Sequence, residues 1–334
     1  MPQTIAVLGA GSIGCFVGGA LAAANEDVVL VGRPRVRDEI AAHGVTVTDV
    51  DGRAVVTRLV KFATDESGLA DRDVILCCVK SAQTADAAAE IARVARPDAL
   101  VVSLQNGIRN ATVLRERLSQ RVAGGIVGFN VLSKGEGVFR QATSGELVIE
   151  NVEGVPRLAK ALRRAGFTTR VADDIESIQW AKLAMNLNNA VSALSDAPTR
   201  EIVFDPGYRK VLGALIGEAI GVMRAAGIRP GKLGAIPVTW FPLVVSMPTS
   251  LLKVVARAQL KIDPEARSSM WEDLQRGRTT EVDYLNGEIV RLAESRGIDA
   301  PLNRRVVELV REAERAGRGS PRMSADAMRA ALRI

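Results

Sequence analysis

Histidine, cysteine and aromatic residues are scarce in this chain of 334 residues. It has one histidine, three cysteines and 4% aromatic residues. A histidine pair, a histidine metal cluster or a His–Asp relay would depend on His43 alone, which precedes a predicted hairpin and which we interpret as a surface residue. Cys77 and Cys78 are adjacent, and three thiols in this arrangement form neither a disulfide framework nor a zinc site. We therefore expect no metal centre.

The excess of basic residues is an excess of arginine. The net charge is +6, and nine of the 44 basic residues are lysine. Because the arginines are interleaved with acidic residues and stacking aromatics are few, the composition argues against a nucleic-acid partner. Such a surface still favours small anionic ligands. Hydrophobic residues at 47% and charged residues at 25% are ordinary for folded proteins, and the length suits two domains.

Neither a signal peptide nor a membrane segment is predicted. The N-terminus, MPQTIAVLGAG, has no basic region before its apolar run and is typical of a strand. The stretch Leu233–Leu252 carries no charge, but Pro237, Pro242 and Pro248 interrupt it. Each proline removes a helical hydrogen bond that lipid would not replace. We interpret the stretch as a buried connection, a pocket wall or a subunit contact, and we expect a cytoplasmic protein.

Short apolar, β-branched runs alternate with helical patterns over the first half of the chain. Such runs are typical of strands covered by helices on both faces, and therefore of a parallel sheet. Alternation around Asp51–Gly52 predicts a hairpin. The four main runs are Thr4–Leu8, Asp27–Val31, Asp73–Val79 and Ala99–Leu104, and two further candidates are Gly125–Leu132 and Glu146–Glu150. We expect an α/β domain with a doubly wound sheet of the Rossmann type.

The first predicted strand runs directly into the sequence GAGSIG. It opens a predicted helix from Ser12 to about Ala24, which is the context of a dinucleotide-binding loop. Gly9 allows the tight turn, Gly11 lets the backbone approach the pyrophosphate, and Gly14 lets helix and strand pack closely. The helix N-terminus then presents N–H groups to the phosphates. The predicted cofactor-binding residues here are Gly9, Ala10, Gly11, Ser12, Ile13 and Gly14.

The end of the second predicted strand indicates which dinucleotide is bound. NAD enzymes usually place an acidic residue there, about 20 residues past the glycines, and it accepts hydrogen bonds from the ribose hydroxyls. This chain has the sequence VGRPR from Val31 to Arg35, with no acid. Arginine pairs bidentately with phosphate, so Arg33 predicts NADP(H) as the cofactor.

Lys80 and Asn106 also follow predicted strands. Ligands of open α/β sheets lie beyond the carboxyl ends of the strands, so both side chains are candidates for ligand contacts. Their position alone leaves the alternative that each is an ordinary loop residue.

The second half of the chain is predicted to be helical, and the helix Glu176–Leu194 differs from an ordinary surface helix. Lys182, Asn186 and Asn189 fall at i, i+4 and i+7 on one face of an otherwise apolar segment. Asparagine is less favourable than alanine in a helix by roughly half a kcal/mol. A stripe of one lysine and amides therefore indicates a lined pocket, with a solvated face as the alternative. A later helical segment, Ser268–Val290, is broken near Gly277, and periodicity gives Ser269 and Glu281 no special status.

Five segments, in this order along the chain, resemble the ketopantoate reductase (2-dehydropantoate 2-reductase) family. They are GAGSIG, CVKSAQT around Lys80, LQNGI around Asn106, WAKLAMNLNNAVSAL around Lys182 and SSMWEDLQRGRTTEVDYLNG from Ser268. The resemblance implies an NADP-binding Rossmann-like domain over residues 1–172 and an all-helical substrate and catalytic domain over residues 173–334. It also implies NADPH-dependent reduction of 2-dehydropantoate to pantoate, a step toward pantothenate and coenzyme A.

The resemblance assigns roles to individual residues. Lys182 matches the family's proton donor, and Glu281 matches an acid near the nicotinamide end of the cofactor, which makes Glu281 both a catalytic and a cofactor-binding candidate. Lys80 and Asn106 match cofactor contacts, and Asn106 also reaches the substrate. Val131 matches a backbone contact to the cofactor. The residues that match groups holding the substrate are Asn186, Asn189 and Ser269.

The chain also departs from the family pattern. Asn189 comes three residues after Asn186 rather than four, and a substrate-side asparagine of some relatives is Thr199 here. The Leu233–Leu252 stretch and the tail beyond about Arg315 are long. Two alternatives to the 2-dehydropantoate reductase therefore stay open, namely a reductase of a different 2-keto acid and a non-catalytic NADP(H)-binding sensor. A homodimer through the helical domain is a further expectation.

Overall fold

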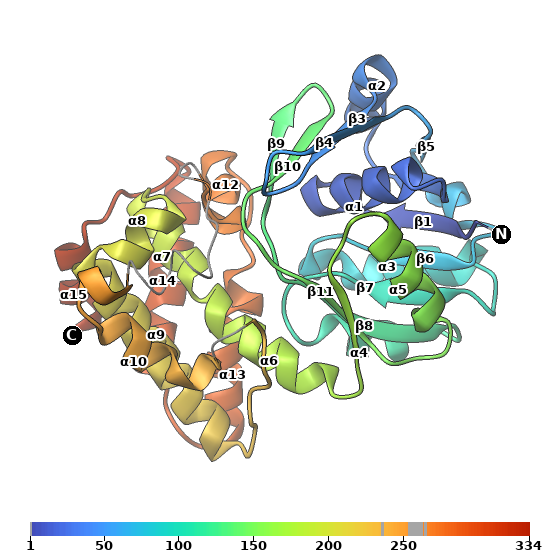
Figure 1. Ribbon diagram of the computed structural model, residues 1–334. Coiled ribbons are helices and arrows are strands. Elements are labelled where there is room, and N and C mark those ends of the chain that lie inside the picture. Colours follow the sequence, from blue (N-terminus) through green and yellow to red (C-terminus); the bar gives the residue numbers. More distant parts are fainter. Residues whose placement is uncertain (1, 235–236, 253–262, 264–265) are drawn as a thin grey trace. The chain divides into compact units, whose positions relative to one another are not determined.

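The chain folds into two compact units, residues Met1–Ile175 and Glu176–Ile334, which we call the N-terminal and C-terminal units. The computed structural model in Figure 1 describes residues 2–234, 237–252, 263 and 266–334. The N-terminal unit contains every strand of the described residues, and the C-terminal unit is built from helices.

An eight-stranded sheet forms the centre of the N-terminal unit. Its spatial order is β12-β11-β8-β7-β6-β1-β2-β5, and the six strands from β8 to β5 are parallel. Numbered along the chain, these six have the order 3-2-1-4-5-6 of the Rossmann fold. β11 runs antiparallel to β8. The strands are β1 (Thr4–Leu8), β2 (Asp27–Val31), β5 (Lys61–Ala63), β6 (Val74–Cys77), β7 (Leu100–Ser103), β8 (Arg121–Val127), β11 (Leu147–Glu150) and β12 (Thr169–Ala172). The predicted doubly wound sheet is confirmed.

Helices cover both faces of this sheet, which explains why its strands are apolar throughout. Alternate residues of β1 point to opposite faces, so Ile5 and Val7 pack with the helices α1 and α5, whereas Ala6 and Leu8 pack with α3 and α4. The helices of this unit are α1 (Ser12–Ala23), α2 (Pro34–His43), α3 (Thr84–Val94), α4 (Asn110–Arg115) and α5 (Val155–Arg164), with 3-10 turns η1 (Glu66–Leu69) and η2 (Ser81–Gln83).

A smaller sheet with the order β4-β3-β10-β9 lies against α1. The strands β3 (Val45–Thr48) and β4 (Ala54–Thr57) form the predicted antiparallel hairpin, whose turn residue Gly52 has a φ of +85°. β10 (Val138–Gln141) pairs with β3, and β9 (Val131–Gly135) pairs with β10.

The single strand predicted over Gly125–Leu132 is wrong, because β8 and β9 belong to different sheets. The chain leaves the large sheet at Gly128, whose N–H donates to the Glu146 carbonyl at 2.8 Å. A Cβ at Gly128 would lie 2.6 Å from that carbonyl oxygen. This close approach requires glycine, and it redirects the chain toward the small sheet.

The described part of the C-terminal unit contains helices and no strand, as predicted. The helices are α6 (Ile175–Asn186), α7 (Asn188–Ser195), α8 (Thr199–Phe204), α9 (Pro206–Ala225), α10 (Phe241–Ser246), α12 (Ser269–Gln275), α13 (Asn286–Ser295), α14 (Pro301–Ala316) and α15 (Ala325–Leu332), with 3-10 turns η3 (Val238–Trp240) and η4 (Val282–Tyr284). The long helix α9 is central, with buried side chains on successive turns. Asp205 caps it by accepting hydrogen bonds from the backbone of Gly207 and Tyr208.

The helix predicted over Glu176–Leu194 is in fact two helices. α6 ends at Asn186, and Leu187 donates its N–H three residues back, to the Ala184 carbonyl at 3.4 Å, before α7 begins. Asparagine-rich segments favour such a break, because the short amide side chain competes for backbone hydrogen bonds. Lys182 and Asn186 therefore share one helix, and Asn189 lies on the next. Leu187 between the two helices keeps right-handed helical dihedrals, with φ −61° and ψ −19°, and the shared face of the three polar side chains stays a prediction.

The uncharged Leu233–Leu252 stretch is partly described, since residues 235–236 lie outside the described part of the chain. Its helix α10 packs on α9. Val238 and Leu252 are buried, whereas Trp240 and Leu243 are more than 60% exposed. Within the described residues, no helix has both the length and the apolarity that crossing a bilayer requires.

Candidate active site

The glycine loop joins β1 to α1 at the point where the strand order of the large sheet reverses. Gly9 has a φ of +104°, and a Cβ there would lie 2.7 Å from the backbone of Cys78. Both the backbone conformation and the close approach therefore require glycine at this position. A Cβ at Gly14 would lie 2.2 Å from the Gly9 carbonyl oxygen. A Cβ at Gly11 would meet none of the described residues within 4 Å. The fold therefore explains Gly9 and Gly14, but it leaves open space at Gly11.

The start of α1, whose first N–H groups have no partner within the helix, lies at this open space. Gly11 is the N-cap residue, and no side chain caps the helix. The first N–H groups of a helix carry a partial positive charge and bind anions such as phosphate. The absence of a side-chain cap and the open space at Gly11 together fit a pyrophosphate at this helix end.

The end of β2 lies beside the same loop. A Cβ at Gly32 would lie 2.5 Å from Cβ of Ala10, so Gly32 lets β2 approach the glycine loop closely. Arg33 follows as the N-cap of α2, and its exposed side chain makes no hydrogen bond or ion pair with the described residues. Its neighbours Arg35 and Arg37 each pair with an acid of α2. Arg33 is thus available to an anionic ligand at the place where NAD enzymes carry an acid.

Lys80 and Asn106 follow β6 and β7, two neighbouring strands, and the structure ties their loops together. Both side chains are half-buried. Ser81, next to Lys80, donates its hydroxyl to the Asn106 carbonyl at 3.0 Å. Asn110 Nδ2 donates to the same carbonyl at 2.5 Å and lies 3.2 Å from Ser81 Oγ. The two loops therefore have one defined geometry relative to each other.

A buried polar network supports this junction from beneath. Thr84 Oγ1 lies 2.8 Å from Asn110 Oδ1 and accepts a hydrogen bond from Gln105 Nε2 at 2.8 Å. Gln105 Oε1 in turn accepts from Ser103 Oγ at 3.0 Å. Each of these side chains is more than 90% buried. A buried, satisfied network of this kind rigidifies its surroundings, because any alternative arrangement leaves a polar group unpaired.

Val131, the predicted backbone contact, is the first residue of β9. Its side chain is buried, and the residue pairs with Gln141 of β10. It lies in the small sheet rather than at the carboxyl ends of the parallel strands. Its role in cofactor binding stays a prediction.

The C-terminal unit holds a lysine with a lowered pKa. Lys182 lies on α6, and burial lowers its pKa from 10.5 to about 8, while the negative charge of Glu281 opposes this shift. Glu281 is half-buried at the start of η4. The adjacent residue Thr280 is anchored, since its N–H donates to Glu314 at 2.7 Å. A lysine of this pKa is well matched to proton transfer near neutral pH.

The predicted substrate groups lie on α6, α7 and α12. Asn186 is half-buried at the end of α6, and Asn189 is buried in the first turn of α7. The amide of Asn189 makes no hydrogen bond with the described residues, although its backbone carbonyl accepts one from Ser268 Oγ at 3.0 Å. Ser269 is exposed at the start of α12, and its hydroxyl has no partner in the described part of the chain. Of the two serines, Ser268 caps α12 and Ser269 remains available to a ligand.

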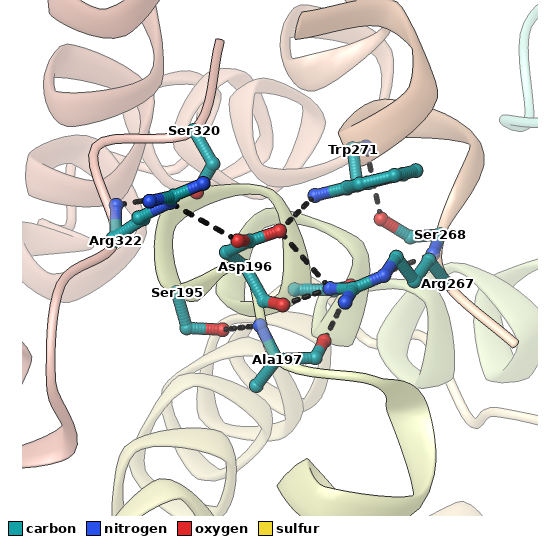
Figure 2. A network of polar contacts seen from close by, with 9 residues as sticks. Ser195, Asp196, Ala197, Arg267, Ser268, Trp271, Ser320 and Arg322 are labelled. Carbon is teal, nitrogen blue, oxygen red and sulfur yellow. Dashed lines mark hydrogen bonds and ion pairs between the residues drawn. The ribbon is translucent and has the colours of Figure 1, made fainter. Parts of the chain in front are cut away.

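Sequence reasoning missed the residues that hold these groups in place. Thr84, Asn110 and Asp196 lie between site-bearing segments, and Figure 2 shows Asp196 at the centre of a polar network in the C-terminal unit. Their partners come from segments far apart in the sequence, so neither periodicity nor motif spacing indicates them. Among the described residues, no cluster of three or more His, Cys, Asp or Glu could hold a metal ion.

Two family models match consecutive parts of the chain. Residues 5–154 match Ketopantoate reductase PanE/ApbA, and residues 174–314 match its C-terminal domain. The chain belongs to the ketopantoate reductase family. The family resemblance expected from five segments is thereby confirmed.

This family member is similar to several known proteins over nearly its whole length. It is 33% identical to the 2-dehydropantoate 2-reductase of Halobacterium salinarum, with 94% of this chain and 99% of the relative covered. A PanE/ApbA family ketopantoate reductase from Ralstonia eutropha, also 33% identical, has a TM-score of 0.79 over 94% of this chain and 99% of that one. A D-mandelate dehydrogenase, solved with NADH and anilino(oxo)acetate, shares the fold with a TM-score of 0.75 at 23% identity over the same shares.

Proposed function

We propose that this ketopantoate reductase reduces 2-dehydropantoate to pantoate with NADPH, in the cytoplasm and as a step toward pantothenate and coenzyme A. The observation that carries the proposal is a lysine of lowered pKa, Lys182, in the same unit as Asn189 and Ser269, whose polar side chains bind none of the described residues. When bound, NADPH supplies the hydride that reduces the C2 ketone. The remaining steps fall to side chains of this chain.

Cofactor binding is the work proposed for the N-terminal unit. The backbone from Gly9 to Gly14 holds the pyrophosphate at the start of α1, and Arg33 pairs with the 2′-phosphate. Lys80 and Asn106 contact the cofactor from the ends of β6 and β7, with Asn106 also reaching the substrate. Val131 adds a backbone contact. From the C-terminal unit, Glu281 acts near the nicotinamide end of the cofactor.

Proton delivery and substrate orientation are the work proposed for the C-terminal unit. Asn186, Asn189 and Ser269 hold the keto acid, and the ammonium group of Lys182 donates a proton to the alkoxide as the hydride arrives. Donation requires the protonated lysine, which a pKa of about 8 provides at neutral pH. We also propose a homodimer, supported by the exposed apolar side chains of Trp240, Leu243 and Leu251, which light scattering would test.

The decisive experiment is steady-state oxidation of NADPH with 2-dehydropantoate beside other branched and aromatic 2-keto acids. We expect the highest kcat/KM with 2-dehydropantoate. A higher value with another keto acid would identify a reductase of that acid. Tight NADPH binding without turnover of any of them would identify a sensor instead.

The Lys182→Ala variant tests the mechanism. We expect its kcat to fall by at least about 100-fold, the usual contribution of a positioned acid, while the Kd for NADPH stays unchanged. Lys210→Ala, which removes an exposed lysine of α9, is the matched control and should retain full activity. Near-normal turnover by Lys182→Ala would contradict the proposed proton donor.

A further inference from the structure

Asp196 connects three segments of the C-terminal unit that are distant in sequence (Figure 2). It follows α7 in the left-handed conformation, with a φ of +64°. Its Oδ1 accepts from Trp271 Nε1 at 2.7 Å and from Arg267 at 3.1 Å. Its Oδ2 forms an ion pair with Arg322 of the C-terminal tail at 3.2 Å. Arg267 also donates to the backbone carbonyl of Asp196.

Arg267 and Trp271, two of the residues that bind Asp196, come two residues before and two residues after the proposed substrate residue Ser269 in the sequence. The Arg267 guanidinium also stacks on the Trp271 ring, 4.6 Å from its centre, so these two side chains contact each other. Asp196 therefore binds the segment before α12 and the first turn of α12 at the same time. The Asp196 carboxylate therefore holds the N-terminal end of α12 in place against the end of α7.

The first turns of α7 also bind the start of α12, through Ser268. Ser268 donates its hydroxyl to the Asn189 carbonyl at 3.0 Å, and its N–H lies 3.4 Å from Ser192 Oγ. The same hydroxyl caps α12 by accepting from the Trp271 N–H at 3.1 Å. The contacts at Ser268 and at Asp196 together give Asn189 and Ser269 a defined relative position.

The single turn residue between α6 and α7, Leu187, keeps right-handed helical dihedrals, with φ −61° and ψ −19°. The contacts at Ser268 and Asp196 hold α7 from outside, in addition to the hydrogen bonds of the helix itself. Asp196 supplies charge-assisted bonds at the far end of α7, which are about twice as strong as neutral ones.

We propose that Asp196 is a positioning residue for the keto-acid substrate, holding Asn189 and Ser269 in the geometry that binds it. This inference rests on the proposed function, because it concerns the residues that the proposed substrate contacts. Arg322 contributes from the tail by balancing the same carboxylate. Asp196 itself makes no contact with the substrate.

The test compares kinetic constants in three variants with two controls. Asp196→Ala removes all three side-chain interactions, Asp196→Asn keeps an acceptor for Trp271 and tolerates the left-handed backbone, and Arg322→Ala removes one ion pair. The controls are Asp326→Asn and Arg318→Ala, which change exposed residues on α15 and the tail. KM and kcat are measured with the best keto acid of the panel, beside the Kd for NADPH and Tm.

We expect Asp196→Ala to raise KM for the keto acid about tenfold, since small misplacements of binding groups are costly. Asp196→Asn and Arg322→Ala should raise it about twofold to fivefold, because each variant weakens only some of the interactions of the carboxylate. The Kd for NADPH should stay unchanged in all three, and the controls should match the wild type. In a double mutant with Ser269→Ala, the KM effect should be smaller than the product of the single effects, because Asp196 acts through Ser269.

Two results would overturn the inference. One is an unchanged KM in all three variants, and the other is a parallel loss of kcat, NADPH affinity and Tm, which marks a purely structural role. If Asp196→Ala does not fold, Asp196→Asn and Arg322→Ala decide the matter in the same way. If Ser269→Ala and Asn189→Ala leave KM unchanged, the proposed substrate site itself is wrong, and the role of Asp196 falls with it.

Discussion

Glu281 raises the pKa of Lys182, burial lowers it, and burial has the larger effect. The outcome is a pKa of about 8 instead of 10.5. Lys182 is therefore mostly protonated at pH 7 and loses its proton within a range that assays can reach. Without Glu281 the same burial would lower the pKa further, and less of the acid form would be present at neutral pH.

This relationship predicts the pH dependence of the reduction. Donation requires the ammonium form, so kcat/KM for the keto acid should fall as the pH rises through about 8. Glu281→Gln removes the charge that raises the lysine pKa, so the falling limb should move to lower pH. Full pH profiles measure this, with Glu312→Gln of α14 as a control whose profile should overlay the wild type. An unshifted limb in Glu281→Gln would show that the limb belongs to another group.

The open space at Gly11 separates cofactor binding from folding. The Gly11→Ala methyl group meets no atom of the described residues within 4 Å. The backbone at Gly11, with a φ of −92°, suits any residue, so Tm should stay unchanged. We expect the Kd for NADPH to rise about tenfold or more, because the methyl group takes the place of the approaching pyrophosphate. Gly14→Ala should instead lower Tm, since its Cβ would lie 2.2 Å from the Gly9 carbonyl oxygen. Unchanged NADPH affinity in Gly11→Ala would place the pyrophosphate elsewhere.

Arg33 predicts the preference for NADPH over NADH. Arg33→Ala should raise the KM for NADPH about tenfold or more, because it removes a charge-assisted contact to the 2′-phosphate. The KM for NADH, which lacks that phosphate, should change by less than about twofold. Arg37→Ala removes a neighbouring arginine that pairs with Asp38 and serves as the control. Equal effects on both cofactors would contradict the assignment.

We expect Asn110 to affect NADPH affinity without contacting the cofactor. Asn110→Ala removes the donor to the Asn106 carbonyl and to Ser81, which keep their hydrogen bond to each other, and each lost hydrogen bond costs about 0.5–1.5 kcal/mol. We expect a weaker Kd for NADPH, similar in size to that of Lys80→Ala, together with a lower Tm. Asn151→Ala, which removes an exposed amide bonded to Asp173, should change neither. A lowered Tm with normal NADPH affinity would show that the network serves stability alone.

The sequence was sufficient wherever the determining interactions are local. The strands Thr4–Leu8 and Asp27–Val31 and the turn at Asp51–Gly52 follow from apolar runs and from turn chemistry, and the structure has them at the predicted residues. The GAGSIG loop likewise follows from adjacent residues. The family was also identified from the sequence, because each of the five resembling segments is a short run of adjacent residues and the five follow the family's order along the chain.

Tertiary structure decided everything that depends on residues distant in sequence. The passage from the large sheet to the small one depends on the approach of Gly128 to Glu146, and the predicted helix is divided into α6 and α7 at the turn residue Leu187. The pKa of Lys182 depends on burial, which no sequence pattern measures. The networks around Asn110 and Asp196 arise when loops and helix ends meet. Local patterns determine which elements form, whereas packing determines which side chains can act together.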